Sequence, residues 1–472
     1  MLKESALYRP EPLFSALGPE FADPVEAADF PKTILRWRNQ RWADRVGLGG
    51  LSDDEWLAHF GRFQPLPDNM QTPLAMRYHG HQFRNYNPQI GDGRGFLFAQ
   101  MRDKAGRLLD LGTKGSGQTP YSRFGDGRLT LKGGLREVLA ASMLEARGVY
   151  TSKAFSLIET GEQLVRHDEP SPTRSAVLVR LQHSHVRFGT FQRHAAHDRA
   201  DLIAQLVDHC VTAYYPHLSN YTGDDKVAAL YGAIVAATAD LAASWMAAGF
   251  VHGVLNTDNM NVTGESFDYG PWRFLPTVQP GFTAAYFDET GLYSYGRQPE
   301  AAAWNLSQLG GTLVMVCAEE KLNAALQTFS PLYAESLVGR VCAQLGVAPP
   351  AVEVGMQMVS DLLTWMQQTQ VGWDQTLFDL FCFDDTRMNA SPQAAHYEAA
   401  EFAPIRAGFE ALGRVRPERL QHPYFQSSAP VSMVIDEVEA LWSAIAERDD
   451  WSLFEAKLAD VERLRQAMEW TR

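Results

Sequence analysis

Cysteine is scarce in this chain of 472 residues, and positive charge is in deficit. The four cysteines, Cys210, Cys317, Cys342 and Cys382, lie far apart and form no C-x-x-C pair, which excludes a disulfide framework and a cysteine-based zinc site. Lys and Arg number 42 against 56 Asp and Glu, for a net charge of -14. Because a phosphate backbone requires clustered basic residues, we do not expect nucleic acid as a partner.

Long apolar runs are also missing. No run reaches the ~18 apolar residues that cross a membrane, and the segment from Met1 to Glu20 carries no basic-then-apolar signal. We therefore expect a soluble, cytoplasmic protein without a membrane partner. With 45% hydrophobic residues, the chain is long enough for a large core or for two to three packed lobes.

The first half of the chain alternates Gly-rich turns with short apolar runs. Residues 96–101 and 108–111 flank the polar turn 102–107, and this pattern predicts a β-hairpin with Lys114 just past its second strand. A further apolar run at 175–181 predicts another strand. This half is therefore expected to be rich in β-structure.

Helical periodicity begins within the same half and then dominates the chain. Apolar residues share one face from Leu135 to Ala146, and Gly148 follows as a stop. Residues 201–215 and 225–248 predict two longer helices, and the chain from about Ala301 onward predicts a series of amphipathic helices. The fold class is thus α+β, with a β-rich first part and a helical second part.

Two glycine-rich turns precede and follow the predicted hairpin. The first contains Gly91, Gly93 and Arg94, and the second contains Asp126 and Gly127. Glycine lets backbone N–H groups turn toward an anion and lets a phosphate approach without a Cβ clash. A simple tight turn explains the first motif equally well when it is taken by itself.

Cationic residues accompany these turns. Lys114 is followed by Glu137 on the predicted helix, and a lysine held by a helix glutamate is the pattern that fixes a point charge on phosphate oxygens. Arg180 and Arg187 lie on one strand-turn segment, where they suit a polyphosphate tail. Solvated surface charges and ordinary surface ion pairs are the alternatives for these residues.

The segment that begins His252-Gly253-Val254 resembles a kinase catalytic loop, H-R-D-L-x-x-x-N, with one residue missing. Val254 stands at the position of the catalytic Asp, while Asn259 keeps the metal-binding Asn position. Asn259 and Asp268, on either side of an expected hairpin, could hold Mg2+ or Mn2+ together with substrate phosphates. Asp258 is the nearest carboxylate that could replace the missing base; its alternative role is in an Asx turn.

Together these segments resemble the selenoprotein O family of kinase-like protein adenylyltransferases. The resemblance is strong over about residues 70 to 310. The motifs that carry it are Tyr78-His-Gly-His-Gln-Phe83, Gly91-Asp-Gly-Arg94, Thr119-Pro-Tyr-Ser-Arg123, Gly125-Asp-Gly-Arg128, Val186-Arg-Phe-Gly189, Gly253-Val-Leu-Asn-Thr-Asp-Asn-Met260, Asp268-Tyr-Gly-Pro271, Tyr295, Gln298-Pro299 and Trp304-Asn-Leu306.

The resemblance implies a bilobal protein-kinase-like fold that binds ATP in a flipped orientation relative to ordinary kinases. It implies Asp258 as proton acceptor, Asn259 and Asp268 as metal ligands, and Glu137 as the partner of Lys114. The implied nucleotide contacts are Gly91, Gly93, Arg94, Lys114, Asp126, Gly127, Arg180, Arg187 and Asp268. The expected domains are an N-terminal extension (1–75), an N-lobe (76–195), a C-lobe (196–310) and a helical C-terminal region (311–472).

Departures from the family pattern occur at a few places. Arg84 stands where the family usually has Gly, and Phe124 and Lys132-Gly133-Gly134 differ from its usual Arg-rich and Ser-rich segment. The chain ends Glu469-Trp-Thr-Arg472 without the family's terminal Cys or selenocysteine motif, so redox control through such a residue is not expected.

The leading hypothesis is therefore metal-dependent transfer of AMP from ATP to Ser, Thr or Tyr hydroxyls of protein substrates, self-modification included. An ordinary ATP-dependent phosphotransferase, with Asp258 as a displaced base, is the first alternative. A catalytically silent pseudokinase scaffold is the second, supported by Val254 alone.

Overall fold

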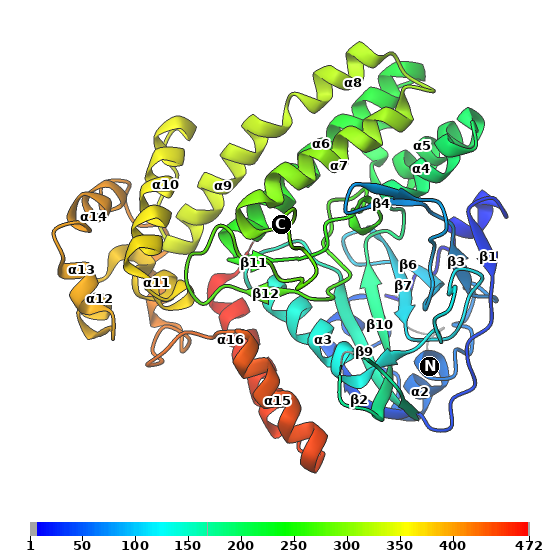
Figure 1. The fold of residues 1–472 in the computed structure, drawn as a ribbon, viewed down its shortest axis with the longest axis horizontal. Helices are drawn as coiled ribbons and strands as arrows, with labels where there is room; N and C mark the ends of the chain where they lie inside the picture. The colour runs from blue at the N-terminus through cyan, green and yellow to red at the C-terminus, as the bar shows by residue number, and fades with distance from the viewer. Residues whose placement is uncertain (1–6, 168, 471–472) are drawn as a thin grey trace.

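A computed structural model of the protein describes residues 7–167 and 169–470. The first part of the chain forms an eight-stranded sheet of antiparallel pairs in the order β1-β3-β6-β7-β10-β9-β2, with β8 paired to β10. Helices make up most of the second part (Figure 1). The strands are β1 (Ala22–Pro24), β2 (Ile34–Arg38), β3 (Leu74–Met76), β6 (Leu97–Arg102), β7 (Leu108–Lys114), β8 (Leu129–Thr130), β9 (Lys153–Leu164) and β10 (Thr173–Gln182).

The predicted hairpin is present as β6 and β7, which pair from Arg102 opposite Leu108. Asp103 shapes the connecting turn, because its carboxylate accepts hydrogen bonds from the backbone N–H groups of Ala105 and Arg107. Lys114 is the last residue of β7 and lies opposite Leu178 of β10. The strand predicted at 175–181 is this β10, which thus anchors the lysine from the neighbouring position in the sheet.

The helix predicted at 135–146 begins one turn earlier, as α3 (Leu131–Ala146). The hydroxyl of Thr130 accepts a hydrogen bond from the N–H of Gly133 and so caps the helix. This cap offsets the low helix propensity of the two glycines near the helix start. A helix that began at Leu135 would have Glu137 in its first turn, but the earlier start places Glu137 in the second turn. The helix packs on β9 and β10, and Gly148 follows its end with a φ of +77°.

The two longer helices are present as α5 (Ala200–Tyr214) and α6 (Gly223–Ala247). Within the described chain, α6 is long and apolar enough to cross a membrane, but 61% of its apolar window is buried by the rest of the fold. A core helix satisfies the same criteria, so the absence of a membrane partner stays a prediction. The strand β11 (Phe250–Val251) follows α6 and pairs with β12 (Arg273–Phe274).

Helices continue from residue 298 to the C-terminal end, as predicted. In Figure 1 the helices α7 to α9 lie above the sheet and α10 to α14 to its left, whereas α15 lies at the bottom and α16 packs on α3. The domain boundaries expected at 75, 195 and 310 stay a prediction, and the terminal residues 471–472 lie outside the described ones. The α-helices are α7 (Gln298–Leu313), α8 (Glu319–Leu326), α9 (Phe329–Leu345), α10 (Val352–Thr369), α11 (Trp373–Asp379), α12 (Asp385–Ala390), α13 (Ala394–Glu398), α14 (Ala403–Glu410), α15 (Ile435–Arg448) and α16 (Ser452–Met468).

The four cysteines are free and buried, in agreement with the absence of a disulfide framework. Burial raises the pKa of the Cys210 thiol far above its ordinary value. These thiols therefore behave as small core side chains.

Candidate functional site

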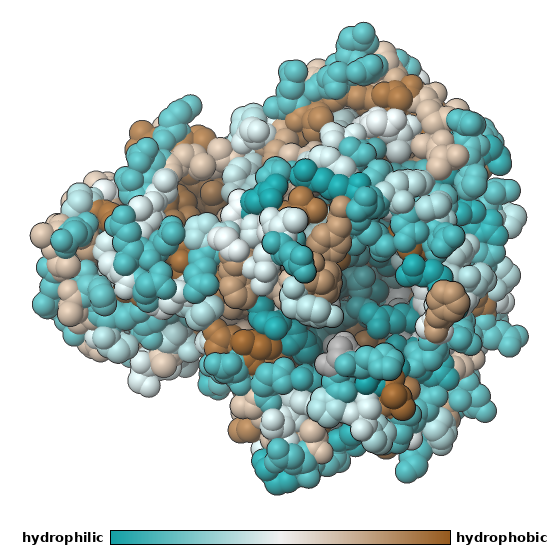
Figure 2. Space-filling model, in the orientation of Figure 1, coloured by the Kyte–Doolittle hydropathy of each residue, from teal (hydrophilic) through white to brown (hydrophobic). Residues whose placement is uncertain are grey.

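A cavity of about 710 Å3 lies where the sheet meets the loops that follow α6, and Figure 2 shows a hollow with hydrophilic walls on this face. We call it the nucleotide cavity, after the ligand that the sequence predicts for its lining residues. Ten of the twelve predicted site residues line it: Gly91, Gly93, Arg94, Lys114, Asp126, Gly127, Arg180, Arg187, Asp258 and Asp268. Segments far apart in the chain thus converge on one space.

Gly91 and Gly127, one in each glycine-rich turn, lie too close to neighbouring atoms to carry a side chain. A Cβ on Gly91 would lie 2.5 Å from the ring of Tyr121. At Gly127, where φ is +70°, it would lie 2.3 Å from the backbone of Gly117. A side chain is therefore excluded at these two positions, where backbone groups can approach a ligand closely.

Lys114 is the charged centre of the cavity. Its ammonium group is paired with Glu137 of α3, as predicted, and donates to Oδ1 of Asp268 at 2.5 Å. Glu137 lies behind the lysine and does not line the cavity itself. The contact between Lys114 and Asp268 joins the first half of the chain to the second.

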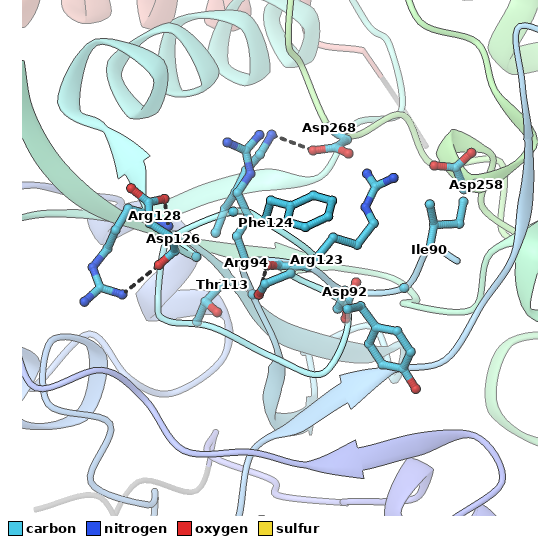
Figure 3. Close-up of a pocket in the computed structure, with 18 of the residues that line it drawn as sticks. Ile90, Asp92, Arg94, Thr113, Arg123, Phe124, Asp126, Arg128, Asp258 and Asp268 are labelled. Atoms are coloured by element: carbon cyan, nitrogen blue, oxygen red, sulfur yellow. Dashed lines mark hydrogen bonds and ion pairs between the residues drawn. The ribbon is translucent and has the colours of Figure 1, made fainter. Parts of the chain in front are cut away.

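Asp268 is ionised in this setting. Burial acts to raise the pKa of its carboxyl, but the nearby cations Lys114, Arg180 and Arg187 hold that pKa well below its usual value. Its backbone adopts a φ of +65°, so the turn that presents the carboxylate is in a left-handed conformation. Figure 3 shows the carboxylate joined by a dashed contact to the cationic groups of the cavity.

Arg180 is a buried cation without a hydrogen-bond partner for two of its nitrogens, Nε and Nη1. Its nearest carboxylates are Asp268, 3.5 Å from Nη1, and Glu137, 3.8 Å from the same atom. An unsatisfied buried guanidinium is costly to a fold, so an anion arriving in the cavity would find a ready donor.

Arg187 begins α4 (Phe188–Ala196) and is fully enclosed. Its guanidinium donates to the carbonyl of Asp258 at 2.8 Å and approaches Oδ1 of Asp92 at 3.4 Å. The rings of Tyr78 and Phe267 lie 4.5 and 4.8 Å from its guanidinium carbon. The arginine therefore binds the backbone of the loop that contains Asp258 as well as lining the cavity.

Asp258 lies in the short 3-10 turn Thr257–Asn259 and is buried. Its Oδ1 has no hydrogen-bond partner, and burial raises the pKa of its carboxyl to about 6, although Arg187 acts in the opposite direction. A Cβ on Gly80 would lie 2.6 Å from Oδ1, so only glycine leaves this oxygen its space. A buried carboxylate with a pKa near neutrality has the properties of a general base.

Asn259 does not line the nucleotide cavity, unlike the other predicted residues of its loop. Its amide donates to the carbonyl of Val254 at 2.9 Å. The hairpin expected between Asn259 and Asp268 is absent; Asn261 bridges to Arg187 and Ser266 to Thr151 instead. These bridges to other segments prevent a local pairing, and β11 and β12 enclose the whole loop.

A divalent metal fits this loop only as a two-ligand site completed by phosphates. In the part of the chain that the structure describes, no group of three or more His, Cys, Asp and Glu residues could hold a metal ion. The sequence predicts Asp268 and Asn259 as its ligands, and their carboxylate and amide oxygens would be the donors that Mg2+ and Mn2+ accept in sites shared with substrate phosphates. The unpartnered Oδ1 of Asp258 is a further oxygen in the same loop.

Several lining residues were not predicted. Arg166 is one of them, and its guanidinium pairs with the carboxylate of the predicted residue Asp126 at 2.8 Å. Figure 3 shows Asp126 and Arg128 at the opposite end of the cavity from Asp258. Phe124 could have been predicted from its position in a glycine-rich turn. Nothing in the neighbouring sequence of Arg166 or Tyr286 indicates that they line the cavity. The unpredicted lining residues with functional groups include Tyr78, Asp92, Arg123, Phe124, Arg128, Arg166 and Tyr286.

His252, the first residue of the loop motif, is held in the core. Its ring is fully buried, and its Nε2 lies 2.9 Å from the carbonyl of Phe267. It does not line the cavity.

A family model described as "Protein adenylyltransferase SelO" matches residues 6–462 of this chain. The chain belongs to the SelO family. A protein nucleotidyltransferase YdiU of Synechocystis sp. is 43% identical over 466 residues, which cover 94% of this chain and 96% of that protein. Proteins of the same name from Gloeobacter violaceus and Trichormus variabilis are 45% and 48% identical, over 94% and 78% of this chain and 93% and 76% of their own lengths. The SelO-family chain described here is accordingly a nucleotidyltransferase enzyme.

Proposed function

We propose that this enzyme transfers AMP from ATP to the hydroxyl of a Ser, Thr or Tyr on a protein, its own surface hydroxyls included. The observation that carries the proposal is the convergence of Lys114, Arg180 and Asp268 on one cavity, whose lining also includes unpartnered buried donors on Arg180 and an unpartnered acceptor on Asp258. Such an arrangement is suited to an anion that carries a metal and approaches a base.

Charge supports ATP as the donor. Seven Lys and Arg side chains line the cavity, against four Asp side chains, although the whole protein carries a net charge of -14. A triphosphate offsets this local excess of positive charge. A cavity of about 710 Å3 also falls within the range that holds a nucleotide. The seven cations are Arg94, Lys114, Arg123, Arg128, Arg166, Arg180 and Arg187.

In this reaction Asp258, Lys114 and Arg180 have distinct roles. The acceptor hydroxyl oxygen forms a bond to the α-phosphorus, the bond from that phosphorus to the pyrophosphate oxygen breaks, and the hydroxyl proton passes to Oδ1 of Asp258. Lys114 and Arg180 offset the charge on the departing pyrophosphate. A bound Mg2+ or Mn2+, held by Asn259 and Asp268, would supply further neutralisation of phosphate charge.

The same proposal includes a bilobal, protein-kinase-like arrangement with ATP flipped relative to kinases. The Lys114–Glu137 pair between a strand and α3, together with the order of sheet and helices, supports the first point. Arg128, which lies at the opposite end of the cavity from Asp258 in Figure 3, supports a triphosphate tail that points away from the base. We further propose a cytoplasmic location, in keeping with the four free cysteines.

Label transfer tests the proposal directly. We expect a protein acceptor to gain label from α-labelled ATP and none from γ-labelled ATP, and intact mass to rise by one adenylyl group. Incorporation of γ-label alone would show a phosphotransferase. Nucleotide binding without transfer of either label to any protein acceptor would show a scaffold.

A further inference from the structure

A second cavity, of about 760 Å3, shares no lining residue with the nucleotide cavity. We call it the basic cavity. Its walls come from α1 (Gln40–Arg45), the β6–β7 turn, the junction of α3 with β9, and the end of α16 with Trp470. It is as large as the nucleotide cavity, and no step of the proposed reaction uses it.

Positive charge dominates these walls. Six Lys and Arg side chains line the basic cavity against three carboxylates. Two of the carboxylates are taken up by ion pairs, since Arg41 binds Glu145 at 2.5 Å and Arg107 binds Asp103 at 2.7 Å. Burial acts to raise the pKa of Glu145, yet Lys153 and Arg41 hold it below its usual value. Cations therefore still outnumber carboxylates on the walls when these two ion pairs are set aside.

Trp42 gathers four of these cations around one ring. The indole is buried, and the charged groups of Arg45, Lys153, Arg41 and Arg107 lie 4.6, 5.2, 5.7 and 5.9 Å from its centroid. Attraction to the ring offsets part of the repulsion among the four charges. The cluster is therefore built into the core of the cavity wall, and it concentrates positive potential there.

Arg45 and Lys104 are exposed members of the lining, so they lie at the mouth of the basic cavity. Among residues 7–167 and 169–470, no carboxylate lies within ion-pair distance of Arg45 or Lys104. Partial burial and the neighbouring Arg41 lower the pKa of the Arg45 guanidinium, as expected for a cation near other cations. These two side chains are free to close on an anion.

We propose that the basic cavity binds a small organic phosphate, of the size of a nucleoside monophosphate. Arginine forks and lysine ammonium groups are the donors that phosphate oxygens require. The volume greatly exceeds that of a single phosphate ion, and Tyr150, Tyr215 and Trp470 give the remaining wall an aromatic surface for an organic portion. The site does not depend on the proposed AMP transfer and stands even if that reaction is wrong.

Hydrogen–deuterium exchange of the full chain locates the ligand. With AMP as probe and a metal chelator present, we expect slower exchange in the segments 103–107 and 145–153. Inorganic phosphate at the same concentration is expected to protect them less. Protection confined to 91–95 and 121–128, or equal protection by phosphate, would overturn the proposal.

A paired variant adds a second criterion. The double substitution Arg45→Ala with Lys104→Ala removes both free cations at the mouth and should weaken AMP binding at the basic cavity by about tenfold or more. The matched control, Lys321→Ala with Arg463→Ala, removes two exposed cations elsewhere and should leave binding unchanged. Equal affinity in the two variants, measured by titration calorimetry with the same exchange readout, would also overturn it.

Discussion

Arg180 and Asp258 both have buried polar atoms without a hydrogen-bond partner. Two guanidinium nitrogens of Arg180 lack an acceptor, and one carboxylate oxygen of Asp258 lacks a donor. Buried polar groups are normally satisfied, and exceptions concentrate at functional sites. The pKa of Asp258, raised to about 6 mainly by burial, adds the property of a base that still ionises at neutral pH. These properties of single residues are stronger evidence for a functional site in the cavity than its volume is.

The substitution Asp258→Asn tests the base. It keeps the shape of the side chain and removes proton acceptance, so label transfer from α-labelled ATP should fall by about 10²- to 10⁴-fold. ATP affinity, measured by titration calorimetry, should change little. The same substitution at exposed Asp436 is the control, and a variant that keeps full transfer would remove Asp258 from the mechanism.

Gly80→Ala tests the space beside that carboxylate. The added Cβ would lie 2.6 Å from Oδ1 of Asp258, so the carboxylate must move and transfer should fall by about tenfold or more. Gly311→Ala is the matched control, because a Cβ there meets nothing within 4 Å. Unchanged transfer rates in both variants would show that the position of Oδ1 is not critical.

Arg84 shows how a departure from the family pattern is accommodated. Its φ of +63° is the conformation that favours the family's usual glycine. The side chain compensates through an ion pair with Glu300 at 2.9 Å and a position 5.3 Å above the ring of Trp304. The strain at this residue is therefore offset by contacts that a glycine could not make.

At the scale of elements, helix α3 connects the sheet to the charged site through Glu137 and Lys114. Its N-terminal turn contains Gly133 and Gly134, which is the reason that periodicity alone places its start too late. A Cβ on Gly134 would lie 2.6 Å from Cδ1 of Leu157 of β9, so the glycine lets the helix pack on the sheet without displacing that side chain. The cap at Thr130 then becomes important for the start of the helix.

Thr130→Ala tests this dependence. Loss of the hydrogen bond to the N–H of Gly133 should lower the free energy of unfolding by about 1 kcal/mol, with Thr130→Ser restoring most of it. Urea unfolding measures the difference. If the alanine variant is as stable as the parent, the cap does not determine where α3 begins.

At the scale of the whole molecule, buried charged contacts join the two halves of the chain. Glu265 accepts a hydrogen bond from the N–H of His183 at 2.8 Å, which links the loop after α6 to the end of the sheet. Burial raises the pKa of its carboxyl to about 7, although Lys153 acts to lower it. This carboxyl is therefore a point where pH acts on the association of the two halves.

The sign of the effect follows from the raised pKa. Between about pH 4.5 and pH 7 the folded protein holds a proton at Glu265 that the unfolded chain releases, so stability is present at low pH and lost as pH rises. The loss is on the order of 3 kcal/mol. Glu265→Gln should therefore flatten the fall in unfolding free energy between about pH 5 and pH 8 in urea titrations. The same change at exposed Glu455 should leave the slope as it is, and an unaltered slope in Glu265→Gln would contradict the prediction.

Local patterns determined the elements of this protein. The alternation of residues 96–111 specified a hairpin, helical periodicity specified α5 and α6, and the catalytic-loop motif singled out Asp258 and Asp268. These features depend on neighbours along the chain, where periodicity and turn chemistry act directly. For residues whose spacing alone left alternatives open, the resemblance to the family predicted a role.

Only the tertiary structure decided which groups share a space and which are left without partners. It brought Arg166 and Tyr286 to the nucleotide cavity, left Asn259 outside its lining, and gathered four cations around Trp42. Burial, pKa and ion pairing depend on contacts between segments far apart in the chain, and such contacts leave no periodic signal in sequence.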